Sequence, residues 1–360
     1  MRAAVFRAGD IVADTIPDPV PTAGQVLVRT LVCGICGSDL HARKHAHRMV
    51  DIAKRTPGRE PMDLSRDIVF GHEFCGELLE NGPGTAVRFK PGARVCSVPM
   101  NMTAQGPKAI GYSNIFPGGF GERMVLSEAL LLEIPNGLSA DRAALTEPLA
   151  VGIHAVEKAA VGPEDVPLVI GCGPVGLAVI AALKRKGAGP IVAADYSPAR
   201  RRLAERMGAH VVVDPAIESP YRRWEDHARR PDGGAAVGAI LRAAPSPFRP
   251  ALVFECVGVP GVIQQVFENV PRDARVVVVG VCMEVDKFEP MFGIVKELNV
   301  QFVLAYTLDE YAAALRAIAE GEVDADALIT GKVGIDGVRQ AFEDLADPET
   351  HTKILVEPWR

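Results

Sequence analysis

The stretch at 166–198 constrains the fold more than any other part of the chain. It reads VPLVIGCGPVGLAVIAALKRKGAGPIVAADYSP. A fully apolar strand leads into a glycine-rich turn and an apolar helix, and a second apolar strand follows. Another helix and further apolar strands come after it, at 199–209, 209–215, 251–258 and 274–281. Strands that alternate with helices in this way indicate a doubly wound parallel sheet, so we expect an α/β protein.

The glycine-rich turn carries the pattern G-x-G-x-x-G in Gly171, Gly173 and Gly176. Such glycines permit a tight turn and a close approach of the backbone to a pyrophosphate, which the helix N-terminus then stabilises. A turn without any ligand is the alternative, but Asp195 ends the next strand, where a carboxylate can accept the ribose hydroxyls of a dinucleotide. The candidate cofactor-binding residues are Gly171, Gly173, Pro174, Val175, Gly176, Asp195, Arg200, Cys256 and Val257.

Asp195 favours NAD over NADP, because its charge would repel a 2′-phosphate. The run of Arg200, Arg201 and Arg202 is evidence for NADP, since an arginine at this place can hold that phosphate. The same run also fits a solvated helix face, with Arg201 and Glu205 at the i,i+4 spacing of a helical ion pair. We therefore expect NAD and keep NADP as the alternative.

Three separate segments supply side chains of the types that bind zinc. They are CGSDLH at 36–41, GHE at 71–73 and EP at 147–148. A catalytic zinc site uses three protein ligands and leaves one position open. Taken singly, a cysteine after a strand is more often a small buried hydrophobe, and the combination is informative because a nucleotide fold follows it. The candidate metal ligands are Cys36, His72, Glu73 and Glu147.

Length and composition limit the class of protein. A chain of 360 residues suggests about two domains. The net charge of −6 provides no basic excess for a nucleic acid, and no apolar run approaches the length of a membrane span. Seven cysteines without disulfide-like spacing indicate a reducing compartment, and Cys33 with Cys36 lacks the second C-x-x-C pair of a zinc ribbon. The start of the chain has no signal-peptide pattern, so we expect a cytoplasmic protein.

The first part of the chain reads as a β-rich domain, because short apolar runs alternate with proline and glycine turns. Two interruptions stand out in it. Residues 41–70 predict a loop with a short helix, and residues 99–121 predict a long loop. Ser139 is a candidate N-cap for a helix that is broken near Pro148.

The last part of the chain returns to mixed elements. The pattern predicts helices at 312–319 and 338–345 and a closing strand at 353–356. This segment is short for a domain of its own, so we assign it to the first domain. The expected organisation is a β-rich catalytic domain at 1–150 and 293–360 and a nucleotide-binding domain at 151–292.

With both candidate sites identified, the chain resembles the zinc-dependent medium-chain alcohol dehydrogenases, in their polyol and threonine dehydrogenase-like branch. The shared motifs follow in the family's order from end to end: GICGSDLH, GHE, PGGFGERMVL, EPLAVGIHAV, GCGPVG with Asp195, and KILVEP. The resemblance implies a GroES-like β-rich catalytic domain and a Rossmann domain. It also implies a bound zinc and a nicotinamide cofactor.

The resemblance implies a role for each site residue. Cys36 and His72 resemble the family's zinc ligands, and Glu73 resembles the carboxylate at or next to the metal. Glu147 stands where liver-type enzymes have a cysteine and polyol dehydrogenases have a glutamate. The candidate catalytic residues are Ser38 and His41, which resemble the proton relay, and Asp39, which resembles the carboxylate that orients the ligating histidine.

The sequence departs from the family pattern in two places. The four closely spaced cysteines of the structural-zinc lobe are absent from 97–113, so we expect one catalytic zinc per chain and no structural zinc. Residues 42–70 are also longer than usual and contain several histidines and arginines, which fit either a solvated surface loop or a segment over the substrate cleft. The substrate therefore cannot be taken from the family.

The expected activity is a reversible hydride transfer between a secondary alcohol or polyol and NAD. Two alternatives remain open at this point: a zinc-free, NADPH-dependent quinone or enone reductase of the same superfamily, and a non-enzymatic nucleotide-binding protein. The expected partner is a small-molecule alcohol, with no nucleic acid and no membrane. We also expect a homodimer or homotetramer, with the apolar stretch at 299–305 as a candidate edge strand.

Overall fold

The structure is a computed structural model, and it describes residues 1–135, 137–230 and 246–360. The chain forms two compact units. The outer unit contains Met1–Pro148 and Thr307–Arg360, and the inner unit is Leu149–Tyr306. The second boundary therefore differs from the expected boundary at 292. Residues 293–306 join the inner unit because strand β16 (Asn299–Phe302) pairs with strand β15 (Arg275–Val278) of its sheet.

The inner unit is built on a parallel sheet with the strand order β13-β12-β11-β14-β15-β16. Its remaining strands are β11 (Val166–Ile170), β12 (Val192–Ala194), β13 (Val211–Val213) and β14 (Ala251–Glu255). The order reverses between β11 and β14, which places the first glycine-rich turn at the topological switch point. The expected doubly wound sheet is confirmed.

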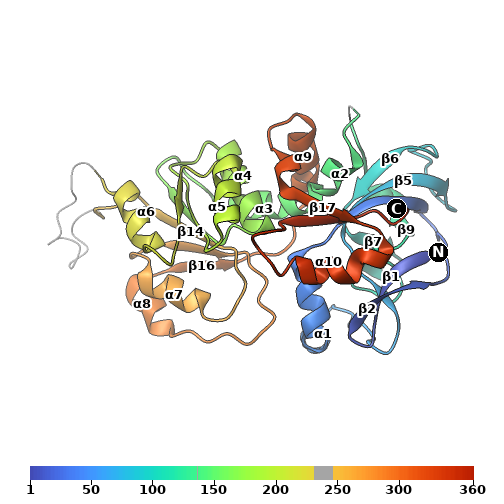
Figure 1. The fold of residues 1–360 in the computed structure, drawn as a ribbon, viewed down its shortest axis with the longest axis horizontal. Helices are drawn as coiled ribbons and strands as arrows, with labels where there is room; N and C mark the ends of the chain where they lie inside the picture. Colours follow the sequence, from blue (N-terminus) through green and yellow to red (C-terminus); the bar gives the residue numbers. More distant parts are fainter. Residues whose placement is uncertain (136, 231–245) are drawn as a thin grey trace. The chain divides into compact units, whose positions relative to one another are not determined.

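Helices cover both faces of this sheet. They are α4 (Pro174–Arg185), α5 (Pro198–Met207), α6 (Pro220–Ala228), α7 (Val262–Asn269) and α8 (Pro290–Lys296), preceded by α3 (Thr146–Lys158). Helices α4 and α5 lie above the sheet in Figure 1, and α7 and α8 lie below it. Trp224 of α6 and Phe267 of α7 are buried in one cluster against Val166 and Val253 of the strands. Burial of both sheet faces explains why the strands read as continuous apolar runs.

The outer unit is rich in β-structure. Its main sheet has the order β10-β6-β5-β3-β18-β17 with β9 also paired to β3, and a second sheet has the order β2-β1-β4. The first strands are β1 (Arg2–Arg7), β2 (Asp10–Thr15), β3 (Gln25–Gly34), β4 (Ile68–Val69) and β5 (Glu73–Asn81). The later ones are β6 (Arg94–Ser97), β9 (Arg123–Ser127), β10 (Leu131–Glu133), β17 (Ile329–Val333) and β18 (Lys353–Val356). Strand β18 from the chain end pairs with β3 from the chain start, so both ends form one sheet.

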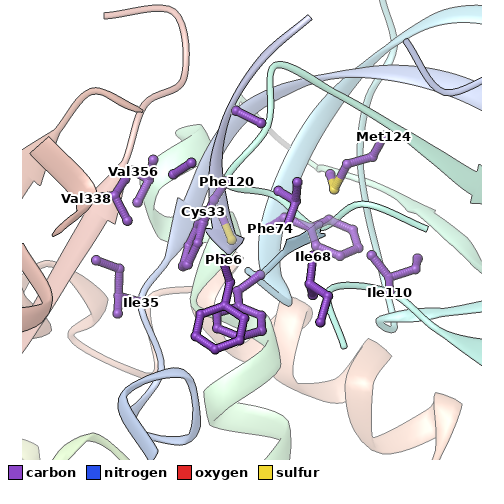
Figure 2. Packing of buried hydrophobic residues seen from close by; sticks show 14 of the residues in the cluster. Phe6, Cys33, Ile35, Ile68, Phe74, Ile110, Phe120, Met124, Val338 and Val356 are labelled. Atoms are coloured by element: carbon purple, nitrogen blue, oxygen red, sulfur yellow. The ribbon is translucent and has the colours of Figure 1, made fainter. Parts of the chain in front are cut away.

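The core of the outer unit joins residues from both ends of the chain. Figure 2 shows Phe6, Phe74 and Phe120 around the buried Cys33, with Val338 and Val356 of the C-terminal segment beside them. The short helices of this segment are α9 (Leu308–Ala319), η2 (Ala325–Leu328), η3 (Ile335–Gly337) and α10 (Val338–Asp344). The helices and the strand expected in this segment are thus confirmed, although α9 begins four residues earlier than the expected start at 312.

Three local expectations are corrected in their extent. At 41–70, where a loop with a short helix is expected, helix α1 (Gly37–Arg55), whose Ala42 and Ala46 are buried, continues to Arg55, and an irregular stretch follows it up to β4. The expected long loop at 99–121 contains a hairpin of β7 (Met100–Thr103) and β8 (Gly106–Ala109). Ser139 does cap a helix, α2 (Ala140–Ala144), but the break before α3 falls at Leu145 rather than at Pro148. Proline is tolerated in the first turn of α3, where its missing N–H costs nothing.

Among the described residues, no helix is both long enough and apolar enough to cross a bilayer.

Candidate active site

The start of helix α1 holds four of the candidate residues, Cys36, Ser38, Asp39 and His41. Cys36 is the N-cap residue, and its backbone N–H donates to Oδ2 of Asp39 at 3.0 Å. This bond satisfies one of the N–H groups that a helix start leaves open. This bond fixes the side chain of Asp39, which is fully buried and lies in the first turn of the helix that follows Cys36.

His72 immediately precedes β5, and Glu73 is the first residue of that strand. The preceding Gly71 has a φ of +100°, and a Cβ there would lie 2.7 Å from the ring of Phe120, so only glycine fits this bend. The bend directs the next two side chains toward Cys36. Ligand atoms of Cys36, His72 and Glu73 all lie within 4.8 Å of one another.

Asp39 lies beside the His72 ring. Its Oδ1 lies 3.4 Å from His72 Nδ1, a nitrogen that is buried and makes no hydrogen bond. Burial lowers the pKa of His72, but the charges of Asp39 and Cys36 outweigh burial and hold that pKa well above its usual value.

Glu73 forms a buried ion pair with Lys353 of β18. Lys353 Nζ donates to Oε1 and Oε2 of Glu73 at 2.7 and 2.6 Å and to the carbonyl of Ile35 at 2.9 Å. The two side chains are 1% and 0% exposed. A Cβ on Gly34 would collide with Glu73 Oε2, so glycine leaves the space for this carboxylate. Both oxygens of Glu73 are thus engaged by a cation of the protein.

Glu147 lies in the first turn of α3 and is 7% exposed. It is not in the group of ligand atoms formed by Cys36, His72 and Glu73. Its charge nevertheless reaches Lys353: burial lowers the pKa of Lys353, but the charges of Glu73, Cys36 and Glu147 raise it above its ordinary value. Lys353 is therefore a cation that faces three acidic groups of the site.

Ser38 lies beside the metal-ligand candidates, and it binds a residue that the sequence did not single out. Its Oγ is 3.5 Å from His72 Nε2 and 2.9 Å from the hydroxyl of Tyr112. The Tyr112 hydroxyl also donates to Oδ1 of Asp39 at 2.8 Å. Burial, followed by the charges of Asp39 and Cys36, holds the pKa of Tyr112 well above its usual value, so the phenol keeps its proton.

Tyr112 reaches this place through backbone contacts of its loop. Gly118 N donates to the carbonyl of Val69 and Gly119 N donates to the carbonyl of Gly71, both at 2.8 Å. These bonds fold the segment back against the GHE bend. A tyrosine in a glycine-rich loop carries no signal of such a role, which explains why sequence reasoning missed it.

His41 lies one helical turn beyond Ser38 on α1. Its ring is stacked on that of His45, with the ring centroids 6.4 Å apart. The helix continues to Arg43, which binds Asp10 at 3.0 Å and Glu343 at 2.6 Å. Arg43 is therefore part of an ion-pair network in the outer unit rather than a residue available to a substrate.

The glycine-rich turn of the inner unit has the geometry that its pattern predicts. Gly171 has a φ of +92°, and a Cβ there would lie 2.8 Å from Val257. A Cβ on Gly176 would collide with the carbonyl oxygen of Gly171, so close packing of helix and strand requires glycine. Gly173 is the N-cap of α4, and Pro174 occupies its first turn. Cys256 is buried beside this turn, and burial raises the pKa of its thiol well above the usual value.

Asp195 follows β12 and is tied to the glycine turn. Its Oδ2 accepts from the N–H of Cys172 at 2.8 Å and its Oδ1 accepts from the N–H of Ser197 at 2.9 Å. Arg200 Nη1 lies 3.9 Å from Asp195 Oδ2, and it would also lie 3.9 Å from a Cβ added to Gly173. Arg201 does not form the expected pair with Glu205 but binds Asp214 at 3.0 Å.

Comparison with known proteins places this geometry in a family. The alcohol dehydrogenase GroES-like domain matches residues 22–136, and the zinc-binding dehydrogenase family matches residues 174–320. An (R,R)-butanediol dehydrogenase of Bacillus subtilis is 33% identical over 358 residues, which cover 97% of each chain. The chain belongs to the zinc-type medium-chain alcohol dehydrogenases.

Further proteins that are similar to this alcohol dehydrogenase support the same family. A sorbitol dehydrogenase of Gallus gallus is 28% identical over 352 residues, which cover 94% of this chain and 91% of that protein. A solved oxidoreductase/dehydrogenase of unknown specificity from Escherichia coli has a TM-score of 0.82 and 25% identity and covers 99% of this chain and 98% of its own.

Membership of the family confirms two expectations from the sequence. The fold combines a GroES-like domain with a Rossmann-like parallel sheet, and the protein is a zinc-type oxidoreductase that acts on alcohols or polyols. The zinc-free reductase and the non-enzymatic binding protein are not favoured.

The residues of the outer unit fit the zinc that the family implies. A thiol, an imidazole and nearby carboxylates are the ordinary donors of zinc. The second ring nitrogen of His72 faces the buried carboxylate of Asp39, which is the support that a ligating histidine normally has. The glycine turn and Asp195 likewise fit a nicotinamide dinucleotide. A Cβ at the glycines would fill the space along the turn that a pyrophosphate needs.

Proposed function

We propose that this chain reversibly oxidises a secondary hydroxyl of a diol or polyol to a ketone, with NAD as the hydride acceptor. The observation that carries the proposal is the cluster of ligand atoms of Cys36, His72 and Glu73, with Ser38 Oγ 3.5 Å from Nε2 of His72 and the buried Asp39 3.4 Å from its Nδ1. Butanediol and sorbitol dehydrogenases among the relatives support the substrate class.

The proposed ligands of a single zinc are Cys36, His72 and Glu147. Glu73 is nearer to Cys36 and His72, but its two oxygens are engaged by Lys353 at 2.6 and 2.7 Å. Glu73 is thus assigned to the support of the site, together with Asp39. Zinc bound here would act as a Lewis acid that lowers the pKa of the substrate hydroxyl.

The remaining steps belong to residues of the chain. Ser38 accepts the proton that the substrate hydroxyl gives up, because its oxygen lies beside the proposed ligand His72. As Ser38 takes up this proton it releases its own hydroxyl proton, and His41, one turn further along α1, takes the released proton up, since an imidazole titrates in the physiological range. Asp39 holds the tautomer and the orientation of His72.

We propose no structural zinc in the region where the family carries one. The segment after Ser97 has no cysteine up to Cys172. Ordinary contacts hold it instead: Asn114 accepts from the N–H of Asp63 at 2.8 Å and donates to the Asp63 carbonyl at 3.0 Å. Lys108 of β8 forms an ion pair with Glu60 of the insert. The insert thereby supports the loop that a zinc lobe would otherwise hold.

We propose an oligomer in which the β16 strands of two copies pair along their edges. Phe302 of β16 is 64% exposed and Leu304 is 63% exposed, and among the described residues β16 is the last strand of the parallel sheet. Apolar side chains beside an unpaired edge favour association with a second copy.

We also propose that the protein works in a reducing compartment. All seven cysteines are free thiols, which supports a location in the cytoplasm.

The cofactor preference can be tested at Asp195. In Asp195→Asn, the ratio of kcat/KM with NAD to kcat/KM with NADP is expected to fall about tenfold to a hundredfold, because a charge a few ångströms from the 2′-phosphate is worth a few kcal/mol. Asparagine keeps the side-chain shape beside Cys172 and Ser197. Adding Arg200→Ala should reverse the gain with NADP. An unchanged ratio in Asp195→Asn would assign the cofactor preference to other residues.

The proposed activity can be tested with a panel of substrates. Butanediols, sorbitol and other polyols, simple primary alcohols and hydroxy acids would be compared by NAD reduction. We expect the highest kcat/KM with a diol or polyol that carries a secondary hydroxyl. Turnover restricted to quinones or enones with NADPH would contradict the proposal.

A further inference from the structure

Glu255 is a buried carboxylate at the end of β14, on the edge of the parallel sheet at which ligands bind. Its Oε1 accepts from the N–H of Val257 at 2.7 Å and from the N–H of Gly258 at 2.8 Å. Burial raises the pKa of Glu255, and the two N–H groups act against this shift because they stabilise the charged carboxylate. One side chain thus holds the start of the loop that follows β14.

The same residue also holds the loop that follows β15. The main-chain carbonyl of Glu255 accepts from the N–H groups of Val279 and Gly280, both at 2.9 Å. A Cβ on Gly280 would lie 2.3 Å from the nitrogen of Gly258 and 2.9 Å from Oε2 of Glu255, so the two loops approach each other closely there. Neither loop can move far without breaking a bond to Glu255.

The loop after β14 packs against the glycine-rich turn after β11. The N–H of Cys256 donates to the carbonyl of Ile170 at 2.8 Å, and a Cβ on Gly171 would lie 2.8 Å from Cγ2 of Val257. Val257 is exposed, so its side chain reaches the surface beside the turn at which a pyrophosphate is expected. The bonds of Glu255 therefore determine where Val257 lies relative to that turn.

We propose that Glu255 is a positioning residue for the cofactor, which it serves by holding Val257 and Gly258 against the glycine-rich turn. The cofactor requires the conformation of this loop and not the charge of the Glu255 carboxylate. The inference rests on the proposed function, since NAD is the cofactor proposed there. Asp286 allows position and charge to be separated. It lines the same cavity of about 220 Å³ as Glu255, but its Oδ1 accepts from the N–H of Gly261 instead.

The test is the dissociation constant for NADH, measured by fluorescence titration of the zinc-loaded protein. Glu255→Asp keeps the charge but is one methylene shorter, so it cannot reach both N–H groups. We expect it to raise the dissociation constant about tenfold, the scale of a lost hydrogen bond to a charged group. Glu255→Gln loses the charge and keeps an oxygen that accepts from both N–H groups, so binding should stay within about threefold. KM for NAD should follow the same order, while kcat at saturating NAD should change less than about twofold in both variants.

Asp286→Asn is the control, since it removes a charge from the same cavity without removing a bond to Val257 or Gly258, and it should bind NADH as the unmodified protein does. Unchanged binding in Glu255→Asp would overturn the inference, and so would a loss in Glu255→Gln as large as that in Glu255→Asp. An equal loss in Asp286→Asn would assign the effect to the charge of the cavity and overturn it as well. Absence of alcohol oxidation in an unmodified protein that binds NADH would instead contradict the proposed function.

Discussion

Cys36→Ser is expected to remove the zinc and to lower kcat/KM for alcohol oxidation by about a thousandfold or more. A neutral hydroxyl replaces a thiolate that is the softest and most strongly binding donor of the proposed set. Loss of a Lewis acid at the reacting oxygen is worth several kcal/mol in the transition state, and each 1.36 kcal/mol is about tenfold in rate. Zinc content and NAD reduction would be measured on the same preparation.

Nucleotide binding separates loss of the metal from loss of the fold. NADH binding to Cys36→Ser, measured by fluorescence, should match the unmodified protein, because the glycine turn and Asp195 lie in the inner unit. Cys282→Ser is the matched control, since Cys282 is a partly exposed thiol of the inner unit whose Sγ donates to the carbonyl oxygen of Glu284. Retained zinc or retained turnover in Cys36→Ser would contradict the proposed site.

Lys353→Met is expected to destabilise the metal-free protein by about 3–5 kcal/mol, because it leaves Glu73 buried without a counter-ion. Lys353 is 1% exposed, and Glu73, Cys36 and Glu147 all lie close enough for their charges to raise its pKa. Removing the cation leaves these acidic groups facing one another in a site with little water. Urea unfolding in the presence of a chelator would measure the loss without any contribution from zinc.

Two further variants show whether the loss comes from the unpaired charge. Lys332→Met removes a lysine that pairs with Asp141 and Glu357 at 33% exposure, and it should cost about 1 kcal/mol or less. Adding Glu73→Met to Lys353→Met should restore much of the stability, since two apolar side chains replace the whole ion pair. A loss in Lys353→Met no larger than that in Lys332→Met would contradict this account of the pair.

The fold of the inner unit could be predicted because local sequence and final environment agree there. Strands such as β11 are buried on both faces, so each one reads as an apolar run that ends at a glycine turn. The collisions that a Cβ would make at Gly171 and Gly176 are also local to the turn. The position of Asp195 at the end of β12 follows from the same repeat.

The active-site candidates could be predicted as residue types but not as a set of contacts. Cys36 and His72 stand in recognisable motifs, and the structure brings them together. Nothing in the sequence relates Lys353 to Glu73, which are separated by 280 positions and meet because β18 pairs with β3, the neighbour of β5. The sequence therefore could not decide between Glu73 and Glu147 as the third ligand.

Irregular segments were predicted least well, because their structure depends on distant partners. The loop that carries Tyr112 is shaped by bonds of Gly118 and Gly119 to the backbone around Gly71. The length of α1 depends on burial of Ala42 and Ala46, which read as parts of a charged stretch. In both cases the stabilising contacts lie outside the local sequence pattern.

The most direct test of the central claim is the zinc content per chain, determined by elemental analysis on a preparation whose NAD-linked turnover of a polyol is known. We predict one zinc per chain, loss of turnover when a chelator removes it, and recovery of turnover when zinc is returned. Full turnover in metal-free protein would contradict a zinc site at Cys36, His72 and Glu147.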